Sequence, residues 1–290
     1  MDDFAISPTV MRGPRMLYGT AWKKADTERL VATAIRLGFR GIDTACQPKH
    51  YDEAGVGAGV AACLNAGLTR ADLFLQTKFT SLSGQDPKRI PYDLNAPLPE
   101  QVAQSFAASL RNLRTDYLDS LVLHSPLADA QHTMTVWRAM ESLVDVGGVR
   151  HLGISNCYRL DQLDSLYRSA RIKPAVVQNR FHADSSYDHE IRAFCSRQRI
   201  AYQSFWTLTA NAHVLVRDAI RTLASTYKRT AAQILFRYLT QAEVVPLTGT
   251  RSEAHMREDL AIFEFQLTDR ERAAVDAIFF QESYPSRRNG

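Results

Sequence analysis

The sequence lacks the features of a membrane, secreted or disulfide-stabilised protein. No apolar run approaches the roughly 20 residues that a bilayer-spanning helix needs. The first residues, Met1-Asp2-Asp3-Phe4, contain neither the basic nor the apolar segment of a secretory signal. Only four cysteines occur among 290 residues, and no two of them have Cys-x-x-Cys spacing. We therefore expect a cytoplasmic protein with free thiols and no membrane partner.

A strong charge of one sign is also missing. Lys and Arg number 35 against 31 Asp and Glu, and the basic residues are scattered, so we expect no nucleic-acid partner. The apolar fraction of 45% and charged fraction of 23% are typical of a globular enzyme. No linker divides the chain, so we expect one domain over residues 1–290, a monomer by default, with no metal.

What the sequence does contain is an alternation of short aliphatic runs with longer helical patterns. Runs such as Leu121-Val122-Leu123 are typical of parallel strands that are covered on both faces. The expected strands are Met16–Gly19, Gly41–Asp43, Leu73–Phe79, Tyr117–His124, Val149–Ser155, Ala175–Phe181, Ala201–Phe205 and Val244–Thr248.

Helical periodicity fills the intervals between these runs. Apolar residues recur at helical spacing over residues 30–37, 102–113 and 136–144, with Pro99 near one start and Gly38 after one end. Eight strand-then-helix units in about 250 residues favour an α/β fold of the TIM type, a (β/α)8 barrel. An open, doubly wound sheet is the alternative on spacing alone.

Ionisable residues stand at the ends of three consecutive strands. Asp43 ends the second run, Lys78 lies near the end of the third, and His124 ends the fourth. In a barrel these ends meet at one mouth, where charges are costly unless they are paired. Tyr51 follows in the loop after the second strand. We therefore expect the four side chains to form one site.

These four residue types suit proton transfer to a carbonyl oxygen. A tyrosine has a reference pKa of about 10, and we expect a neighbouring lysine to lower it. An aspartate would balance the lysine, and a histidine would orient the carbonyl by hydrogen bonding. Such a site donates a proton while a hydride arrives from a cofactor.

With these residues in this order, the chain resembles the aldo-keto reductase superfamily from about Met16 to Phe280. The motifs that carry the resemblance are Gly41-Ile42-Asp43-Thr44-Ala45, Gln76-Thr77-Lys78 and Leu123-His124-Ser125. The resemblance implies an oxidoreductase that reversibly reduces an aldehyde or ketone to an alcohol with NADPH or NADH. It implies Tyr51, Lys78, Asp43 and His124 as the catalytic residues.

The resemblance also implies the ligand contacts. Trp22, Tyr51 and His124 would contact the substrate. The residues implied for the cofactor are Asp43, Ser155, Asn156, Gln178, Ser204, Trp206, Thr248, Gly249, Thr250, Arg251, His255, Glu258 and Asp259. The basic pair that NADPH-preferring relatives carry is replaced here by Leu247 and His255. We expect a modest preference for NADPH, in which Arg251 binds the ribose 2′-phosphate and His255 helps when protonated.

Three departures from the family pattern affect these expectations. The tyrosine comes eight residues after Asp43 instead of five, which indicates a three-residue insertion and leaves His50 as the second choice of proton donor. Ser125 replaces an aromatic after the histidine. Gln203 stands where an aromatic usually stacks on the nicotinamide, so Tyr202, Phe205 or Trp206 takes that role or the stacking is absent.

Several alternatives remain open at this stage. Gly55-Val56-Gly57-Ala58-Gly59 is either a dinucleotide-binding loop or, as we prefer, a helix with small residues for close packing. The chain could bind NADP(H) as a catalytically silent regulatory or scaffold subunit. It could also be an unrelated barrel hydrolase or lyase. The sequence does not name the substrate.

Overall fold

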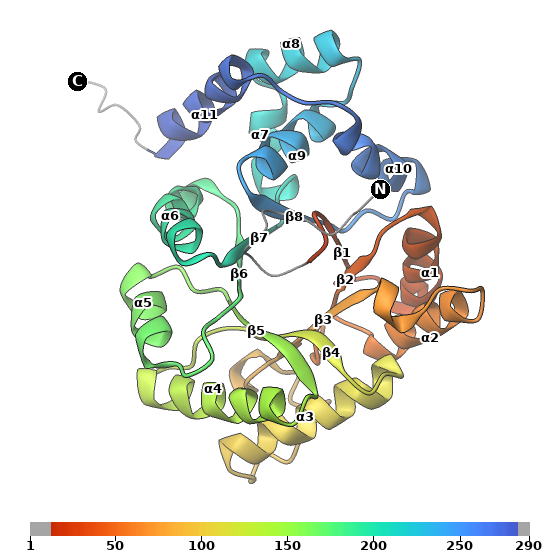
Figure 1. Cartoon of the computed structure of the whole chain (residues 1–290), viewed down its shortest axis with the longest axis vertical. Coiled ribbons are helices and arrows are strands. Elements are labelled where there is room, and N and C mark those ends of the chain that lie inside the picture. The colour runs from red at the N-terminus through yellow and green to blue at the C-terminus, as the bar shows by residue number, and fades with distance from the viewer. Residues whose placement is uncertain (1–12, 284–290) are drawn as a thin grey trace.

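A computed structural model describes residues 13–283 as a closed barrel of eight parallel strands. Each strand pairs with its neighbours in chain order, and the last strand returns to the first through Leu17 opposite Leu247 and Tyr18 opposite Thr248. Figure 1 shows the ring of strands with helices around it. The expected (β/α)8 barrel is confirmed, and closure excludes the open sheet.

All eight strands lie where the sequence predicted them, to within one residue at each end. Their aliphatic residues are buried because helices cover the outside of the barrel and side chains fill the inside. The strands are β1 Leu17–Gly19, β2 Gly41–Asp43, β3 Phe74–Phe79, β4 Leu118–Leu123, β5 Val149–Ser155, β6 Val176–Arg180, β7 Ala201–Phe205 and β8 Val244–Thr248.

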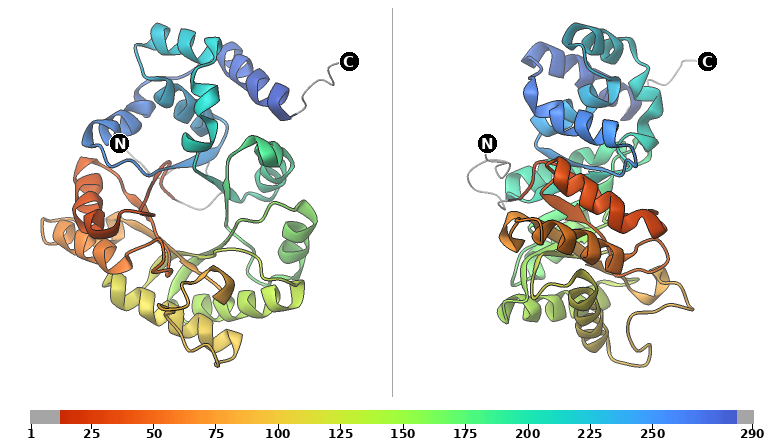
Figure 2. Two further views of the ribbon diagram at one scale, coloured as in Figure 1. Left: turned by 180° about the vertical axis from the view of Figure 1, so that it is seen from behind. Right: turned by 90° about the vertical axis from the view of Figure 1, so that its right-hand side faces the viewer.

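The three predicted helices are α1, α3 and α4. In α1, Gly38 ends the helix with a φ of 125° and donates its N–H to the carbonyls of Ala34 and Ile35. Figure 2 shows α8 to α11 gathered on the β7 and β8 side of the barrel. The helices are α1 Thr27–Leu37, α2 Glu53–Leu64, α3 Leu98–Leu113, α4 Ala130–Asp145, α5 Leu160–Ser169, α6 His189–Gln198, α7 Ala212–Leu215, α8 Asp218–Tyr227, α9 Ala231–Gln241, α10 Glu253–Leu260 and α11 Asp269–Ser283.

The barrel interior changes from apolar to polar along its axis. A small cluster of four buried side chains, separate from the main core, comes from β1, β3 and β8: Leu17, Phe74, Val245 and Leu247. Further along β3 the same face continues with Gln76 and Lys78, because strand residues two apart share a face. The polar end is therefore the carboxyl end of the strands.

The glycine-rich segment forms part of α2 and packs closely against two helices. A Cβ at Gly57 would lie 2.0 Å from the carbonyl oxygen of Asn112 in α3. A Cβ at Gly59 would lie 2.6 Å from the carbonyl oxygen of Glu28 in α1. These glycines allow backbone-to-backbone approach on both sides of α2. The helix interpretation is confirmed, and the dinucleotide-binding alternative is wrong.

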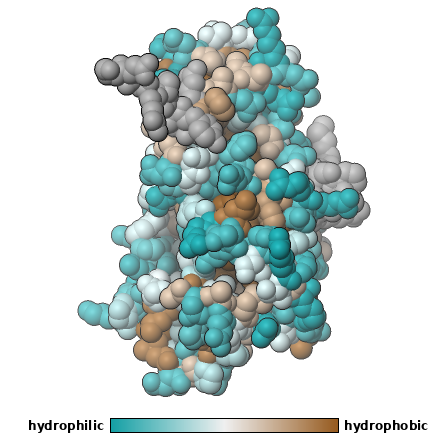
Figure 3. Space-filling model, turned by 90° about the vertical axis from the view of Figure 1, so that its left-hand side faces the viewer, coloured by the Kyte–Doolittle hydropathy of each residue, from teal (hydrophilic) through white to brown (hydrophobic). Residues whose placement is uncertain are grey.

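The surface on the α5 and α6 side is mainly hydrophilic, with apolar residues in small separate groups (Figure 3). Among the helices within residues 13–283, none has both the length and the hydropathy to cross a bilayer. The four cysteines are all buried and form no disulfides. The expectation of free thiols is therefore met.

The contact at Gly57 generates a stability prediction. Changing Gly57 to Ala should lower the free energy of unfolding by about 1–3 kcal/mol, because the methyl group forces α2 and α3 apart. This loss should occur although Ala favours helix over Gly by about 1 kcal/mol. Urea denaturation measures the change.

Ala62, on the exposed face of the same helix, provides the control. Ala62→Gly should cost only the helix-propensity difference of about 1 kcal/mol. A Gly57→Ala protein as stable as the unmodified one would show that separating α2 from α3 costs no more than the about 1 kcal/mol that Ala gains in helix propensity.

Candidate active site

A cavity of about 670 Å³ opens at the carboxyl ends of the strands. Loops that follow strands on opposite sides of the barrel form its wall, as expected for a barrel enzyme. It brings together most of the residues predicted from the sequence. Those that line it are Trp22, Asp43, Tyr51, His124, Ser155, Asn156, Gln178, Trp206, Thr248, Gly249, Thr250 and Arg251.

Lys78 lies beneath the cavity in a buried ion pair with Asp43. The Lys78 Nζ atom is 2.7 Å from each carboxylate oxygen of Asp43 and 2.8 Å from the carbonyl oxygen of Thr44. The side chains are only 1% and 4% exposed. The three N–H groups of the ammonium are therefore all used, and each buried charge is balanced.

The segment in which we expect a three-residue insertion forms a tight turn that places Tyr51 near this pair. The backbone N–H groups of His50 and Tyr51 both donate to the carbonyl of Gln47, at 3.1 Å each. The Gln47 side chain donates to the carbonyl of Gly84, 2.7 Å away, which anchors the turn. The ring centroid of Tyr51 then lies 5.5 Å from Lys78 Nζ.

His50 points elsewhere. Its ring packs against Trp22 at a tilt of 37°, with centroids 3.8 Å apart, whereas the Tyr51 ring lies edge-on to His124 at 6.1 Å. Among the predicted catalytic residues, the structure therefore groups Tyr51 with Lys78, Asp43 and His124. His50 shares the cavity wall with Trp22 at the edge of this group.

The expectation that lysine lowers the pKa of Tyr51 is wrong for this arrangement. Burial and, secondly, the negative charge of Asp43 raise the pKa of Tyr51 above its ordinary value. The physical reason is that Lys78 donates to Asp43 and Thr44 and has no N–H left for the phenol oxygen. Tyr51 is consequently a neutral phenol at physiological pH.

His124 is also neutral, and Thr80 fixes its ring. Burial, with the nearby charges of Lys78 and His50, lowers the pKa of His124 to about 3. Its Nδ1 atom lies 2.6 Å from the hydroxyl oxygen of Thr80. Among residues 13–283 this hydroxyl has no other hydrogen-bond partner. If the hydroxyl donates to Nδ1, the proton of the ring is on Nε2.

Thr80 was missed by the sequence analysis, although a signal was present. Gln76, Lys78 and Thr80 alternate along β3 and its end, and this spacing places all three on one face. A buried strand with three polar residues on one face needs partners for each. Thr80 is 4% exposed, and its backbone carbonyl accepts from the Tyr92 hydroxyl at 2.9 Å.

Three glutamines form a buried amide layer under Asp43. Gln76 and Gln178 each donate to Asp43 Oδ1, at 2.8 and 2.9 Å, and each also donates to Gln203 Oε1, at 2.7 and 2.9 Å. Gln203 returns a bond to Gln76 at 3.2 Å. The side chain of Gln203 is therefore held inside the barrel. The sequence analysis found Gln178 but not the layer.

The aromatic that the family usually places at position 203 has two possible substitutes here. Tyr202 does not line the cavity, because its hydroxyl lies 3.0 Å from the buried Asp188. Phe205 and Trp206 do line it. Of the three candidates named from the sequence, only these two can stack on a ligand in the cavity.

Ser155, Asn156 and Gln178 lie together on one side of the cavity. The Ser155 hydroxyl donates to the Gln178 carbonyl at 2.6 Å, and the Asn156 amide donates to the His124 carbonyl at 2.8 Å. Within residues 13–283 no group donates to the Gln178 Oε1 atom, because the side-chain bonds of Gln178 run through Nε2. This side of the cavity presents amide and hydroxyl groups that suit a carboxamide.

Positive charge gathers where the loops after β1 and β8 meet. Lys23 donates to the Gly249 carbonyl. Its pKa is lowered to about 8, mainly by burial and secondly by the positive charge of Arg251. Arg251 donates to Asp26 at 2.9 Å and to the Trp22 carbonyl at 2.7 Å. Lys23 was missed by the sequence analysis, and its signal was its position directly after Trp22.

The remaining predicted cofactor residues lie outside the cavity wall. Ser204 is fully buried and bonds to Thr207, 2.9 Å away, which does line the cavity. On α10, His255 is exposed, Glu258 is half-buried and Asp259 is buried. Burial raises the pKa of Asp259 to about 6, although a hydrogen bond with Thr248 acts in the opposite direction and lowers it.

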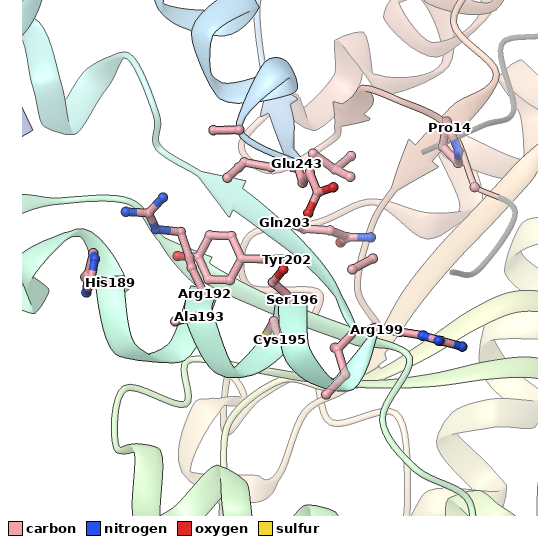
Figure 4. A pocket seen from close by; sticks show the side chains of 16 residues that line it. Pro14, His189, Arg192, Ala193, Cys195, Ser196, Arg199, Tyr202, Gln203 and Glu243 are labelled. Atoms are coloured by element: carbon pink, nitrogen blue, oxygen red, sulfur yellow. The ribbon is translucent and has the colours of Figure 1, made fainter. Parts of the chain in front are cut away.

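A second cavity, of about 440 Å³, lies near the amino-terminal ends of β7 and β8. Tyr202, Gln203 and Glu243 contribute to its wall, and Figure 4 shows Arg192 and Arg199 extending in opposite directions. Of the site residues considered from the sequence, only Tyr202, one of the three stacking candidates, lines it. Over the part of the chain that the structure describes, no three His, Cys, Asp or Glu side chains form a possible metal site.

Comparison with known proteins gives the same family that the residues suggested. The model of the Aldo/keto reductase family matches residues 15–279. The glyoxal reductase of Bacillus subtilis is 30% identical over 248 residues, which cover 86% of this chain and 82% of the relative. The methylglyoxal reductase DkgA of Yersinia pestis is 28% identical over 251 residues, covering 86% of this chain and 83% of the relative.

A solved structure extends the match to three dimensions. The aldo-keto reductase of Bombyx mori in complex with NADP superposes with a TM-score of 0.76 at 25% identity. The match covers 91% of this chain and 89% of the other.

The contact between Thr80 and His124 generates a spectroscopic prediction. Thr80→Val removes the hydroxyl at nearly constant volume and should shift the His124 tautomer equilibrium by about 1 kcal/mol, roughly fivefold, because one hydrogen bond is lost. Nitrogen NMR shifts of the His124 ring measure the tautomer.

Thr80→Ser is the matched control, since it keeps the hydroxyl and should keep the spectrum. Identical ring shifts in the Val and Ser proteins would mean that Thr80 does not set the tautomer.

Proposed function

Because the chain belongs to the aldo/keto reductase family of oxidoreductases, we propose that it reduces an aldehyde or ketone to an alcohol with NADPH or NADH. The observation that carries the proposal is the grouping of Tyr51, His124 and the Lys78–Asp43 pair at one cavity. A neutral phenol and a neutral imidazole edge suit a neutral carbonyl oxygen.

The cavity wall fits a nicotinamide dinucleotide in its charges and in its donor set. Ser155, Asn156 and Gln178 would hold the carboxamide, and Phe205 or Trp206 would stack on the ring. Lys23 and Arg251 would face the phosphates, where cations are needed. When bound, the nicotinamide supplies the hydride.

The protein's own residues manage the proton and the orientation of the substrate. His124 would donate Nε2–H to the carbonyl oxygen, and Trp22 would border the substrate. As negative charge develops on that oxygen, Tyr51 transfers its phenolic proton to it. An alkoxide is a much stronger base than a phenolate, so this transfer is favourable even though burial raises the pKa of Tyr51. Lys78 balances Asp43, whose negative charge disfavours the tyrosinate.

The relatives support a small carbonyl substrate. Two of them are named for glyoxal and methylglyoxal, which are small dicarbonyl compounds. A silent regulatory subunit would need only the cofactor wall, whereas this chain also keeps the buried Lys78–Asp43 pair next to Tyr51. That pair favours the enzyme, and the silent subunit remains the second candidate. We further propose a single-domain, monomeric, cytoplasmic protein.

The proposed proton donor is tested by Tyr51→Phe. This change should lower kcat by at least about a thousandfold, at the upper end of general-acid contributions, while leaving cofactor affinity unchanged. Cofactor absorbance is followed with a panel of aldehydes and ketones, and cofactor binding is measured by fluorescence.

His50→Phe serves as the control, because His50 is the second choice of proton donor. Retained turnover in Tyr51→Phe, with lost turnover in His50→Phe, would move the role to His50. Cofactor binding without turnover of any carbonyl by the unmodified protein would favour the silent subunit.

Cofactor preference is tested at the two cations. Arg251→Ala should raise KM for NADPH about tenfold, equivalent to about 1.4 kcal/mol, and leave NADH almost unchanged. The effect is modest because Arg251 already donates to Asp26 and Trp22. Equal losses for both cofactors would place Arg251 outside the 2′-phosphate site.

Lys23→Met is the comparison, since a pyrophosphate is common to both cofactors. It should weaken NADPH and NADH alike. In the unmodified protein both affinities should fall above about pH 8, where Lys23 loses its proton. The Lys23→Met protein should lack this pH dependence of cofactor affinity. If the pH dependence persists in that protein, another group is responsible for the titration.

A further inference from the structure

Arg180 ends β6 and contributes to the wall of the cavity. It lies two residues after Gln178, so both side chains are on the same face of the strand. The rise along a strand places Arg180 about 6–7 Å nearer the mouth of the barrel. Arg180 therefore lies one layer outside the amides that suit a carboxamide.

Arg180 has no counter-ion within the described part of the chain. No carboxylate within residues 13–283 lies at ion-pair distance, and its Nε atom is buried without a hydrogen-bond partner there. Of the other basic groups here, Lys78 pairs with Asp43 and Arg251 with Asp26. Lys23 donates to the Gly249 carbonyl. A half-buried guanidinium without an anion is costly unless a ligand supplies one.

Trp206 holds the guanidinium without neutralising it. The Arg180 Cζ atom lies 4.3 Å from the Trp206 ring centroid, a cation–π contact. Its backbone N–H donates to the Tyr158 hydroxyl at 3.1 Å, which fixes the strand end. Stacking uses the face of the planar group and leaves its N–H edge for a carboxylate, which it can bind bidentately.

The charges around the cavity favour an anionic ligand at this point. Asp43 is the only carboxylate among the described residues that line the cavity, and Lys78 balances it. Lys23 and Arg251 lie at the β1 and β8 side, where the phosphates of the cofactor are proposed to bind. Arg180 lies on β6, beside the carboxamide wall, and is therefore available to a different anion.

We propose that Arg180 binds a carboxylate of the substrate, so that the preferred substrates are oxo acids. This inference rests on the proposed reductase function. In the ring of eight strands β6 lies opposite β2, after which Tyr51 follows. The carbonyl at Tyr51 and the acid at Arg180 must therefore be separated by several bonds, as in 4-carboxybenzaldehyde, and not adjacent as in a 2-oxo acid.

The test compares 4-carboxybenzaldehyde with its methyl ester, which has the same ring and carbonyl but no charge. The unmodified protein should prefer the acid. Arg180→Met should raise KM for the acid about tenfold or more and change KM for the ester and affinity for NADPH little. Arg180→Lys should retain part of the preference, because the charge remains. Arg138→Met removes an exposed charge on α4 and should change neither the two KM values nor the affinity for NADPH.

Three results would overturn the proposal. Equal losses for acid and ester in Arg180→Met would show that Arg180 acts only by packing on Trp206. A weakened NADPH affinity would assign Arg180 to the cofactor. An unmodified protein that prefers the ester would exclude a carboxylate site.

A failure of the proposed function itself is distinguishable. If neither aldehyde is reduced, calorimetry of 4-carboxybenzaldehyde binding to the unmodified and Arg180→Met proteins still tests the carboxylate site. Binding that depends on Arg180 would support it without turnover. Binding that is equal or absent in both proteins would overturn it.

Discussion

The buried pair of Lys78 and Asp43 is the interaction on which the rest of this site depends. Two charges with exposures of 1% and 4% are stable only if each balances the other and all their hydrogen-bonding groups are used. Lys78 reaches that state through both Asp43 oxygens and the Thr44 carbonyl. Asp43 reaches it through Lys78 and the amides of Gln76 and Gln178. The ends of β2, β3 and β6 are joined by these bonds.

This closed pair explains why its neighbours are uncharged. A free lysine ammonium beside Tyr51 would favour the phenolate, but here the charge of Lys78 is balanced and its N–H groups are occupied. Burial then determines the protonation of both neighbours: it raises the pKa of Tyr51 and lowers that of His124 to about 3. Both rings remain neutral around pH 7 and carry a proton that a carbonyl oxygen can accept.

Much of the fold could be predicted from the sequence because a parallel barrel repeats a simple pattern. A strand covered on both faces reads as an apolar run, and the eight runs gave the strand bounds to within one residue. The polar residues at the strand ends, Asp43, Lys78 and His124, could be found for the same reason. Their position follows from backbone topology alone.

Side-chain partners could not be predicted in this way. The bond from Thr80 to His124 and the layer of three glutamines join residues 25 to 127 positions apart, and no local pattern fixes such distances. For this reason our expectation of a lowered pKa for Tyr51 was wrong. The sequence showed that a lysine was near, but not that its three N–H groups were already occupied.

One substitution in the family pattern has consequences across the cavity. An aromatic at position 203 would stack on a ligand, but Gln203 instead completes the amide layer beneath Asp43. On the β7 side, the aromatic surface of the cavity therefore comes from the end of the strand and the loop after it, as Phe205 and Trp206. Trp206, with a φ of 56°, turns at that point and packs on Arg180. The cavity wall there therefore combines an aromatic ring with a cation that has no counter-ion within the described residues.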